Sequence, residues 1–294
     1  MKTSNLSAAK VGEKTLFIVG ATASGKSDLA IRLAKVLGGE IICADSRTVY
    51  TGMDIGTAKP TIADRANAVH YLLDVVYPNQ PYTVHQFQID AKEKIKDISS
   101  RNRLPIICGG SGLYVDSVLF DYNFPETAEQ IMDMSVVRMQ EIIQVRGLDK
   151  PNNWNNPRHL KRVIETGVVA NDLKKILDGT IIVGIRPKPE VLAKNIELRV
   201  ENMFLSGLEA EVTELAKVYG WQLKALDGIG YKEIRQFSEG TVTESEAKKL
   251  IALRTRQFAK RQTTWFKRNP NIVWFESSDE AFDYICRTFL VQFK

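Results

Sequence analysis

The sequence contains a glycine-rich stretch whose spacing suits the binding of phosphate groups. Residues 20–27 read Gly-Ala-Thr-Ala-Ser-Gly-Lys-Ser. Backbone N–H groups of such a loop, with the positive end of a following helix, form a cradle for an anion. Lys26 would add a mobile cation, and the Ser27 hydroxyl would be a metal ligand for Mg²⁺. The residues of this phosphate loop that we predict to bind a diphosphate or a nucleotide are Gly20, Ala21, Thr22, Ala23, Ser24, Gly25, Lys26 and Ser27.

The residues on either side of the phosphate loop support this interpretation. The apolar run 16–19 precedes it, and apolar residues at helical spacing follow between 29 and 37. An ordinary glycine turn with a capping serine is the alternative, but it does not need a buried strand before it and a helix after it. The stretch therefore predicts a ligand that carries phosphates, and it leaves open whether that ligand is ATP.

Two other apolar runs end in polar residues. The run 40–44 is followed by Asp45, and the run 104–108 is followed by two glycines and Ser111. The carboxyl ends of strands in an open parallel sheet form the ligand crevice. Asp45 is thus a site candidate, although its pattern fits a turn cap equally well. The glycines would let the backbone approach a ligand, and Ser111 offers a hydroxyl.

Apolar runs alternate with amphipathic patterns along the chain. Further strands are expected at 70–76, 104–108, 179–185 and 272–275, and helices at 82–101, 187–205, 208–219, 230–237, from 243 onward and at 279–291. Residues Phe87, Ile89, Ala91, Ile95 and Ile98 are expected to face inward. This predicts an α/β fold, a P-loop NTPase-like parallel sheet flanked by helices, with a helical C-terminal part.

The pattern changes between residues 121 and 156. A Met- and Gln-rich helical pattern is followed there by a polar, Asn-rich loop. We expect a small helical insertion at 121–156, with the core formed by 15–120 and 157–294. The loop 53–60, punctuated by Gly and Pro, could close over a phosphate site or simply connect two elements.

Composition excludes several classes of protein. The 294 residues are 44% hydrophobic and 26% charged, which allows a substantial core. No apolar run approaches the ~20 residues that span a bilayer, and the first 14 residues are polar. We therefore expect a cytoplasmic protein without a membrane partner. The three cysteines lie far apart, which suggests neither a metal site nor a disulfide framework.

The helix predicted from 243 onward concentrates positive charge. Between residues 248 and 268 there are eight Lys or Arg and no acidic residue. Arg254, Arg261 and Arg268 fall on one stripe, with Arg256, Lys260 and Lys267 on a neighbouring one. Solvated faces normally mix signs, so this density favours recognition of nucleic acid or polyphosphate. One alternative is a solvated face that binds no ligand. The other is that these cations point inward and bind the same diphosphate as the phosphate loop.

Six motifs together resemble the ordered signature of the tRNA dimethylallyltransferases, also called tRNA isopentenyltransferases or the IPP transferase family. They are residues 20–27, 45–47, 53–60, 109–114, 228–233 and 255–266. The resemblance spans residues 16 to about 268. It implies that the phosphate loop binds the diphosphate of dimethylallyl diphosphate instead of that of ATP. The dimethylallyl group then goes to the exocyclic amine of the adenosine just 3′ of the anticodon in tRNA.

The resemblance also implies roles for single residues. Asp45 matches the catalytic carboxylate that holds the adenine amine and accepts its proton, and Ser111 stands where the family has a Thr in its reaction channel. Arg256 and Arg261 lie in the segment that contributes cations to the diphosphate. The implied tRNA contacts are Asp45, Ser46, Arg47, Thr48, Arg158, His159, Lys161, Arg162, Arg254, Lys260 and Lys267. The expected partner is the anticodon loop of tRNA. We expect the insertion 121–156 to contact tRNA, and we expect a monomer.

Besides Ser111, the chain departs from the family pattern at Thr48, where the family usually has Gln, and at His159, where it usually has Arg. Residues 162–165 read Arg-Val-Ile-Glu in place of the usual Arg-Ala-Leu-Glu, and the insertion 121–156 also differs from the pattern. Two other functions share most of the motifs. A P-loop kinase of a small metabolite would use the same cradle for ATP. A prenyltransferase of free adenine nucleotide would need no tRNA surface, and the basic helix speaks against it.

Overall fold

The structure is a computed structural model, and it describes residues 14–122, 124, 134–151, 153–167, 176 and 179–291. The chain divides into two compact units. The first comprises residues 1–115 and 178–294, and the second comprises residues 116–177. Among the described residues, no helix is long and apolar enough to span a bilayer.

A six-stranded sheet forms the centre of the first unit. Its strands are β1 (Thr15–Gly20), β2 (Gly39–Cys43), β3 (His70–Tyr71), β4 (Leu104–Gly109), β5 (Thr180–Ile185) and β6 (Val273–Phe275). The order is β3-β2-β4-β1-β5-β6, and all neighbours pair in parallel. The inner strands are apolar along their length because helices cover both faces. The predicted P-loop NTPase-like parallel sheet is confirmed.

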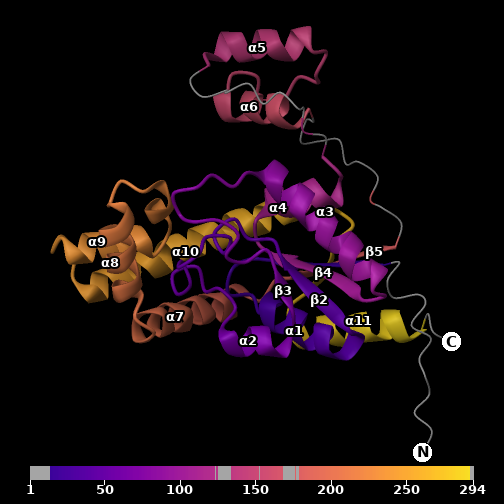
Figure 1. The fold of residues 1–294 in the computed structure, drawn as a ribbon, viewed down its shortest axis with the longest axis horizontal. Coiled ribbons are helices and arrows are strands. Elements are labelled where there is room, and N and C mark those ends of the chain that lie inside the picture. Colours follow the sequence, from indigo (N-terminus) through magenta and orange to yellow (C-terminus); the bar gives the residue numbers. More distant parts are fainter. Residues whose placement is uncertain are drawn as a thin grey trace, which may run out of the picture. The chain divides into compact units, whose positions relative to one another are not determined.

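Helices cover the two faces of the sheet (Figure 1). On one face, α1 (Lys26–Leu37) and α11 (Ser278–Val291) lie side by side and bury Leu33 and Ile285 against the strands. On the other face lie α3 (Val84–Ser100) and α4 (Gly112–Leu119). The short helix α2 (Ile62–Asn67) follows the loop 53–60.

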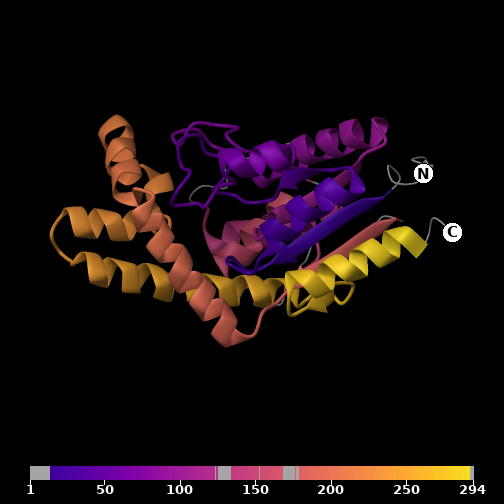
Figure 2. The ribbon, with the colours of Figure 1, turned by 90° about the horizontal axis from the view of Figure 1, so that it is seen from below.

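The C-terminal part of the first unit adds a second core made of helices. These are α7 (Pro189–Leu205), α8 (Leu208–Tyr219), the 3₁₀ turn η2 (Lys224–Asp227), α9 (Tyr231–Ser238) and α10 (Glu244–Phe266). Ile196, Leu208, Tyr231 and Ile251 are buried together there. The capping box of α10, formed by Thr243 and Glu246, is confirmed. Figure 2 shows α10 running from α8 and α9 toward the sheet.

The second unit contains α5 (Val136–Val145) and α6 (Pro157–Thr166). The sequence led us to expect that the core would resume at residue 157, but α6 packs on α5 instead. The reason is the apolar stripe of α6, Leu160, Val163 and Ile164, which is buried against α5. Residues 125–133 of the predicted insertion lie outside the described residues.

Two local predictions differ from the structure. The strand expected at 70–76 ends after Tyr71, because Leu72 and Asp74 adopt positive φ angles of 61° and 54° that interrupt an extended chain. In α3, Ile89 is 47% exposed, whereas Gln88 takes a buried position. Phe87, Ala91 and Ile98 are fully buried and Ile95 is half-buried, so the predicted inward stripe of α3 is wrong only at Ile89.

Candidate active site

The phosphate loop joins the end of β1 to the start of α1. Gly25 and Ala23 adopt left-handed conformations, with φ angles of 90° and 61°. A side chain at Gly20 would approach the Ile185 carbonyl oxygen to 2.7 Å, so only glycine fits where β1 leaves the sheet. The loop thereby turns back over the first turn of α1, whose N–H groups face the same space as the loop.

Lys26 lies at the centre of this turn. Its Nζ donates a hydrogen bond to the Ala21 carbonyl oxygen over 3.0 Å. Burial lowers the pKa of Lys26, and the negative charge of Asp45 partly opposes that shift. Ser24 Oγ is buried without a partner among the described residues. A cation and an unsatisfied hydroxyl beside a helix N-terminus make this loop ready for an anionic ligand.

The strand ends β2 and β4 meet beside the phosphate loop because Cys43 pairs in register with Cys108. Ser111 follows β4, and its Oγ accepts the backbone N–H of Ser46 over 2.9 Å. One oxygen of Asp45, Oδ1, accepts the N–H of Arg47 over 2.9 Å. Asp45 is therefore a turn cap, as one interpretation of the sequence had it, and it also lines the two cavities described next.

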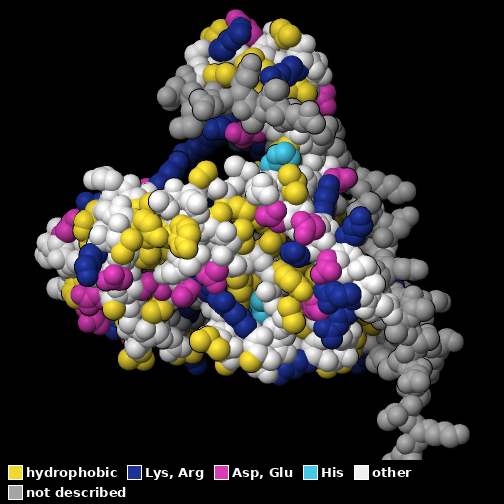
Figure 3. Space-filling model, viewed as in Figure 1, with side chains coloured by type: hydrophobic (Ala, Val, Ile, Leu, Met, Phe, Trp, Pro, Cys, Tyr) yellow, Lys and Arg dark blue, Asp and Glu magenta, His cyan; other side chains and the backbone are white. Residues whose placement is uncertain are grey.

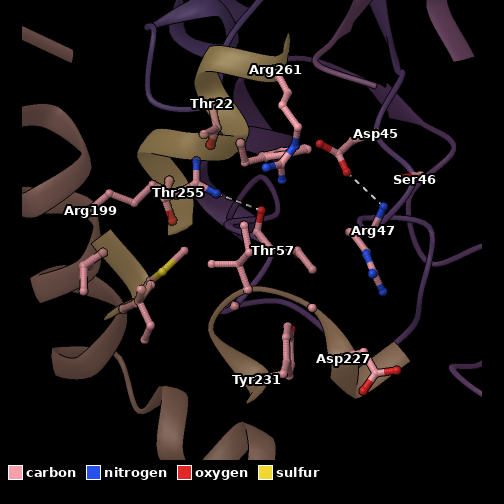
Figure 4. A pocket seen from close by; sticks show the side chains of 17 residues that line it. Thr22, Asp45, Ser46, Arg47, Thr57, Arg199, Asp227, Tyr231, Thr255 and Arg261 are labelled. Carbon is pink, nitrogen blue, oxygen red and sulfur yellow. Dashed lines mark hydrogen bonds between the residues drawn. The ribbon is translucent and has the colours of Figure 1, made fainter. Parts of the chain in front are cut away.

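A cavity of about 350 Å³ opens beside these strand ends (Figure 4). Its walls come from the phosphate loop, the segment after β2, the loop 53–60 and helices α7, α9 and α10. Its polar lining residues are Thr22, Asp45, Ser46, Arg47, Thr57, Arg199, Asp227, Tyr231, Thr255 and Arg261. In Figure 4, Asp45 and Arg261 point toward the same open space.

A smaller cavity of about 60 Å³ is also lined by Asp45. It is lined by Lys26 and Ser27 of the phosphate loop and by the buried Thr48. Thr22, Asp45, Thr57 and Arg199 line both cavities. Asp45 thus borders both the cavity next to Lys26 and Ser27 and a larger space that can hold an acceptor molecule.

Arg199 is a residue of this site that sequence reasoning missed. It comes from α7, an ordinary amphipathic helix without a motif, and its Nη2 donates to the Thr57 carbonyl oxygen over 3.1 Å, as the dashed line in Figure 4 marks. Burial lowers the pKa of Arg199, while Asp45 opposes the shift. Arg199 and Lys26 line the same smaller cavity, so both cations can pair with an anion bound there. Only the tertiary structure brings it to the phosphate loop.

The basic stripes of α10 separate into different environments. Arg261 lines the large cavity, whereas Arg256 is exposed and lies 3.2 Å from Glu197. Arg256 is therefore not among the cavity residues, although it was expected to contribute to the diphosphate. Arg254, expected to face tRNA, is half-buried and pairs with the fully buried Glu233. Lys260 and Lys267 are exposed.

We expect different effects from replacing the exposed cations of α10 and from replacing the half-buried Arg254. If Lys260 and Lys267 contact RNA, each alanine variant should reduce the salt dependence of tRNA binding by about one unit. Arg254→Ala should instead lower the free energy of unfolding by roughly 1–3 kcal/mol, because it leaves the buried Glu233 carboxylate short of a partner. Filter binding across salt concentrations and urea unfolding measure the two effects. Unchanged salt slopes would make the exposed cations a merely solvated face.

The remaining predicted tRNA contacts belong to α6 of the second unit. Arg158 and His159 are exposed. Lys161 lies 3.6 Å from Glu165, and Arg162 Nη2 donates to the Tyr122 hydroxyl over 3.4 Å. Figure 3 shows Lys and Arg side chains interspersed with Asp and Glu on the face it draws. The basic side chains on that face therefore do not form a single large patch.

The loop 53–60 is held over the cavity by a carboxylate from α8. Glu211 accepts the backbone N–H groups of Asp54, Ile55 and Gly56 over 2.9, 2.6 and 3.0 Å, and the Tyr231 hydroxyl over 2.8 Å. A side chain at Gly56 would come within 2.5 Å of the Tyr231 ring. This loop, which sequence alone left as a lid or a connector, is fixed in place by distant residues.

Removing the charge of Glu211 should loosen the loop. In Glu211→Gln, the amide NH₂ faces backbone donors, so local opening should become easier by roughly 1–3 kcal/mol. The amides of residues 54–56 should then exchange hydrogen roughly 5- to 150-fold faster. Glu214→Gln on the exposed side of the same helix is the matched control. Equal exchange in both variants would show that Glu211 does not hold the loop.

Comparisons with known proteins agree with this geometry. The family model described as IPP transferase matches residues 48–269. A tRNA dimethylallyltransferase of Caldicellulosiruptor saccharolyticus is 37% identical in an alignment that covers 92% of this chain and 95% of the relative. That of Carboxydothermus hydrogenoformans is 36% identical in an alignment that covers 96% of this chain and 98% of the relative.

Solved structures give the same result. The tRNA isopentenylpyrophosphate transferase of Bacillus halodurans matches with a TM-score of 0.73 and 31% identity over 96% of each chain. A eukaryotic dimethylallyltransferase acting on tRNA matches with a TM-score of 0.70 and 26% identity, over 86% of this chain and 70% of the other. This chain therefore belongs to the IPP transferase family, whose curated members are named tRNA dimethylallyltransferases.

Proposed function

We propose that this chain transfers the dimethylallyl group of dimethylallyl diphosphate to the exocyclic amine of the adenosine adjacent to the anticodon, on its 3′ side, in tRNA. The observation that carries the proposal is the position of Asp45, which lines both the cavity beside Lys26 and the larger cavity. A transferase of this kind needs a diphosphate cradle, a space for a base, and a proton acceptor between them. The family membership supports the choice of both substrates.

In the proposed reaction, the adenine amine nitrogen forms a bond to C1 of the dimethylallyl group. The C–O bond to the diphosphate breaks, and the diphosphate leaves with the electron pair. Asp45 accepts the proton that the amine loses, through the carboxylate oxygen that Arg47 N–H does not occupy. Lys26, Arg199 and the phosphate-loop N–H groups stabilise the charge that grows on the leaving diphosphate.

The proposed metal ion is Mg²⁺, with the exposed Ser27 hydroxyl as its ligand from the protein. Among the described residues, no cluster of three or more His, Cys, Asp or Glu could hold a metal ion. The hydroxyl oxygen of Ser27 is a hard donor that fits Mg²⁺, an ion that commonly takes its other ligands from substrate phosphates and water. When bound, the ion would neutralise part of the diphosphate charge.

The adenine must leave its stack to reach Asp45. An anticodon loop is already unpaired, so its bases can enter such a cavity at a cost of only a few kcal/mol (about 1–3 per lost stack). The exposed cations on α10 and α6 would hold the phosphate backbone of the loop. We further propose that the protein works as a monomer in the cytoplasm.

The test is incubation with labelled dimethylallyl diphosphate, offering bulk tRNA and AMP in separate reactions. The label should appear in tRNA, at the adenosine that follows the anticodon. Label in AMP alone would point to the nucleotide prenyltransferase instead. A third reaction with ATP and Mg²⁺ examines the kinase alternative, which would be favoured if ATP protected the fold against unfolding better than dimethylallyl diphosphate did.

A further inference from the structure

One buried side chain joins the two loops that serve the two substrates. Gln262 of α10 is 5% exposed. Its Oε1 accepts the backbone N–H of Thr22 over 2.8 Å, and its Nε2 donates to the carbonyl oxygen of Gly110 over 2.9 Å. A side-chain amide is a neutral group that offers an acceptor and a donor together. Both of its functions are used here, and each bond spans more than a hundred residues of sequence.

The two bonded loops face different halves of the proposed reaction. Thr22 belongs to the phosphate loop. Gly110 precedes Ser111, whose hydroxyl fixes the backbone N–H of Ser46, the residue after Asp45. Gln262 therefore links the diphosphate cradle to the segment that carries the proton acceptor.

The packing leaves little room for this link to shift. A side chain at Gly110 would meet Gln262 Nε2 at 2.3 Å, and one at Gly112 would meet the Trp265 ring of the same helix at 2.3 Å. Helix α10 thus presses directly on the glycine loop that follows β4. Arg261, the residue before Gln262 on the same helix, lines the large cavity.

We propose that Gln262 is a positioning residue, which sets the separation between the bound diphosphate and Asp45. The proposal rests on the proposed function. Gln262 lines neither cavity that Asp45 borders, so its loss should affect alignment more than binding. Misplacement of reacting groups by about 1 Å can cost ~10²-fold in rate. The effect should therefore appear in the chemical step at saturating substrate.

The first variant to measure is Gln262→Met, which keeps the length of the side chain but can neither accept from Thr22 nor donate to Gly110. We expect its single-turnover rate at saturation to fall by about 10- to 100-fold. The dissociation constants for tRNA and for dimethylallyl diphosphate should each change less than about fivefold. Gln257→Met, an exposed position on the same helix, is the matched control.

A second variant, Gln262→Glu, adds a readout that general loosening of the fold would not produce. An ionised carboxylate still accepts from Thr22 N–H but opposes the Gly110 carbonyl oxygen. Once protonated, it donates as glutamine does. Burial raises the pKa of such a carboxyl group. The rate of this variant divided by the wild-type rate should therefore rise as pH falls, while the same ratio for Gln262→Met stays flat.

The outcomes separate the two proposals. If the wild type and Gln257→Met do not transfer label to tRNA, the proposed function is wrong. If they do, and Gln262→Met transfers at the wild-type rate or loses only affinity, Gln262 is not a positioning residue. A pH-independent ratio for Gln262→Glu would also overturn the proposal. Should Gln262→Met fail to fold, as its circular dichroism would show, the pH series on Gln262→Glu decides alone.

Discussion

Replacing Lys26 with alanine should reduce transfer of the dimethylallyl label by ~10²- to 10³-fold. The ammonium group lies in the phosphate loop beside the N-terminus of α1, where the diphosphate would gain negative charge as it leaves. No other cation is placed within the loop itself. Because the Lys26 ammonium group donates one hydrogen bond within the described part of the chain, to the Ala21 carbonyl oxygen, its loss should leave the fold intact. Single-turnover transfer to tRNA measures the effect.

The matched control is Lys35→Ala, an exposed lysine in the last turn of the same helix. It should transfer label at the wild-type rate. Affinity for tRNA should be nearly unchanged in both variants, since the exposed Lys260, Lys267 and Arg158 line neither cavity. Wild-type transfer by Lys26→Ala would remove the phosphate loop from the proposed diphosphate site.

The parts of the fold that were predicted correctly have local signals. The phosphate loop, the apolar strand runs and the capping box at Thr243 are each written in a few neighbouring residues. Local patterns also show where a regular helix or strand must end. Where the signal was only apolar character, as at residues 70–76, positive φ angles at Leu72 and Asp74 ended the strand early.

The candidate site was predictable only in part, because several of its contacts join residues far apart in sequence. Arg254 looked like an RNA contact until Glu233 was seen beneath it, 21 positions away. Gln262 reaches Thr22 across 240 positions, and Glu211 reaches the loop 53–60 across more than 150. No periodicity encodes such pairs. The same limit hid Arg199, whose place in the site depends on how α7 packs.

The position of a whole helix, α6 of the second unit, could not be predicted from local sequence either. Pro157 begins α6 with a helix-starting signal, and its basic residues resembled a tRNA-facing segment of the core. Nothing local tells whether its stripe of Leu160, Val163 and Ile164 packs on the sheet or on α5. The structure shows that it packs on α5. The basic residues of α6 are therefore presented by the small unit.

Asp45→Asn should slow the chemical step by ~10²- to 10⁴-fold, roughly 3–5 kcal/mol in the barrier. The structure shows, as the sequence did not, that this substitution tests the proton acceptor separately from the turn cap. An asparagine can keep the hydrogen bond from Arg47 N–H to Oδ1, so the turn stays capped while the proton acceptor is lost. Affinity for tRNA should change far less, because one hydrogen bond contributes only about 1 kcal/mol.

A comparison with Asp45→Ala separates the two roles of the carboxylate. The alanine variant loses the cap as well, so it should match the asparagine variant in single-turnover rate but unfold at a lower urea concentration, by about 1 kcal/mol in stability. Filter binding and single-turnover transfer are measured on both variants. If affinity collapsed while the rate at saturating tRNA stayed normal, Asp45 would be a capping residue alone. The adenine proton would then need another acceptor, and none of the other residues lining both cavities is a carboxylate, since these are Thr22, Thr57 and Arg199.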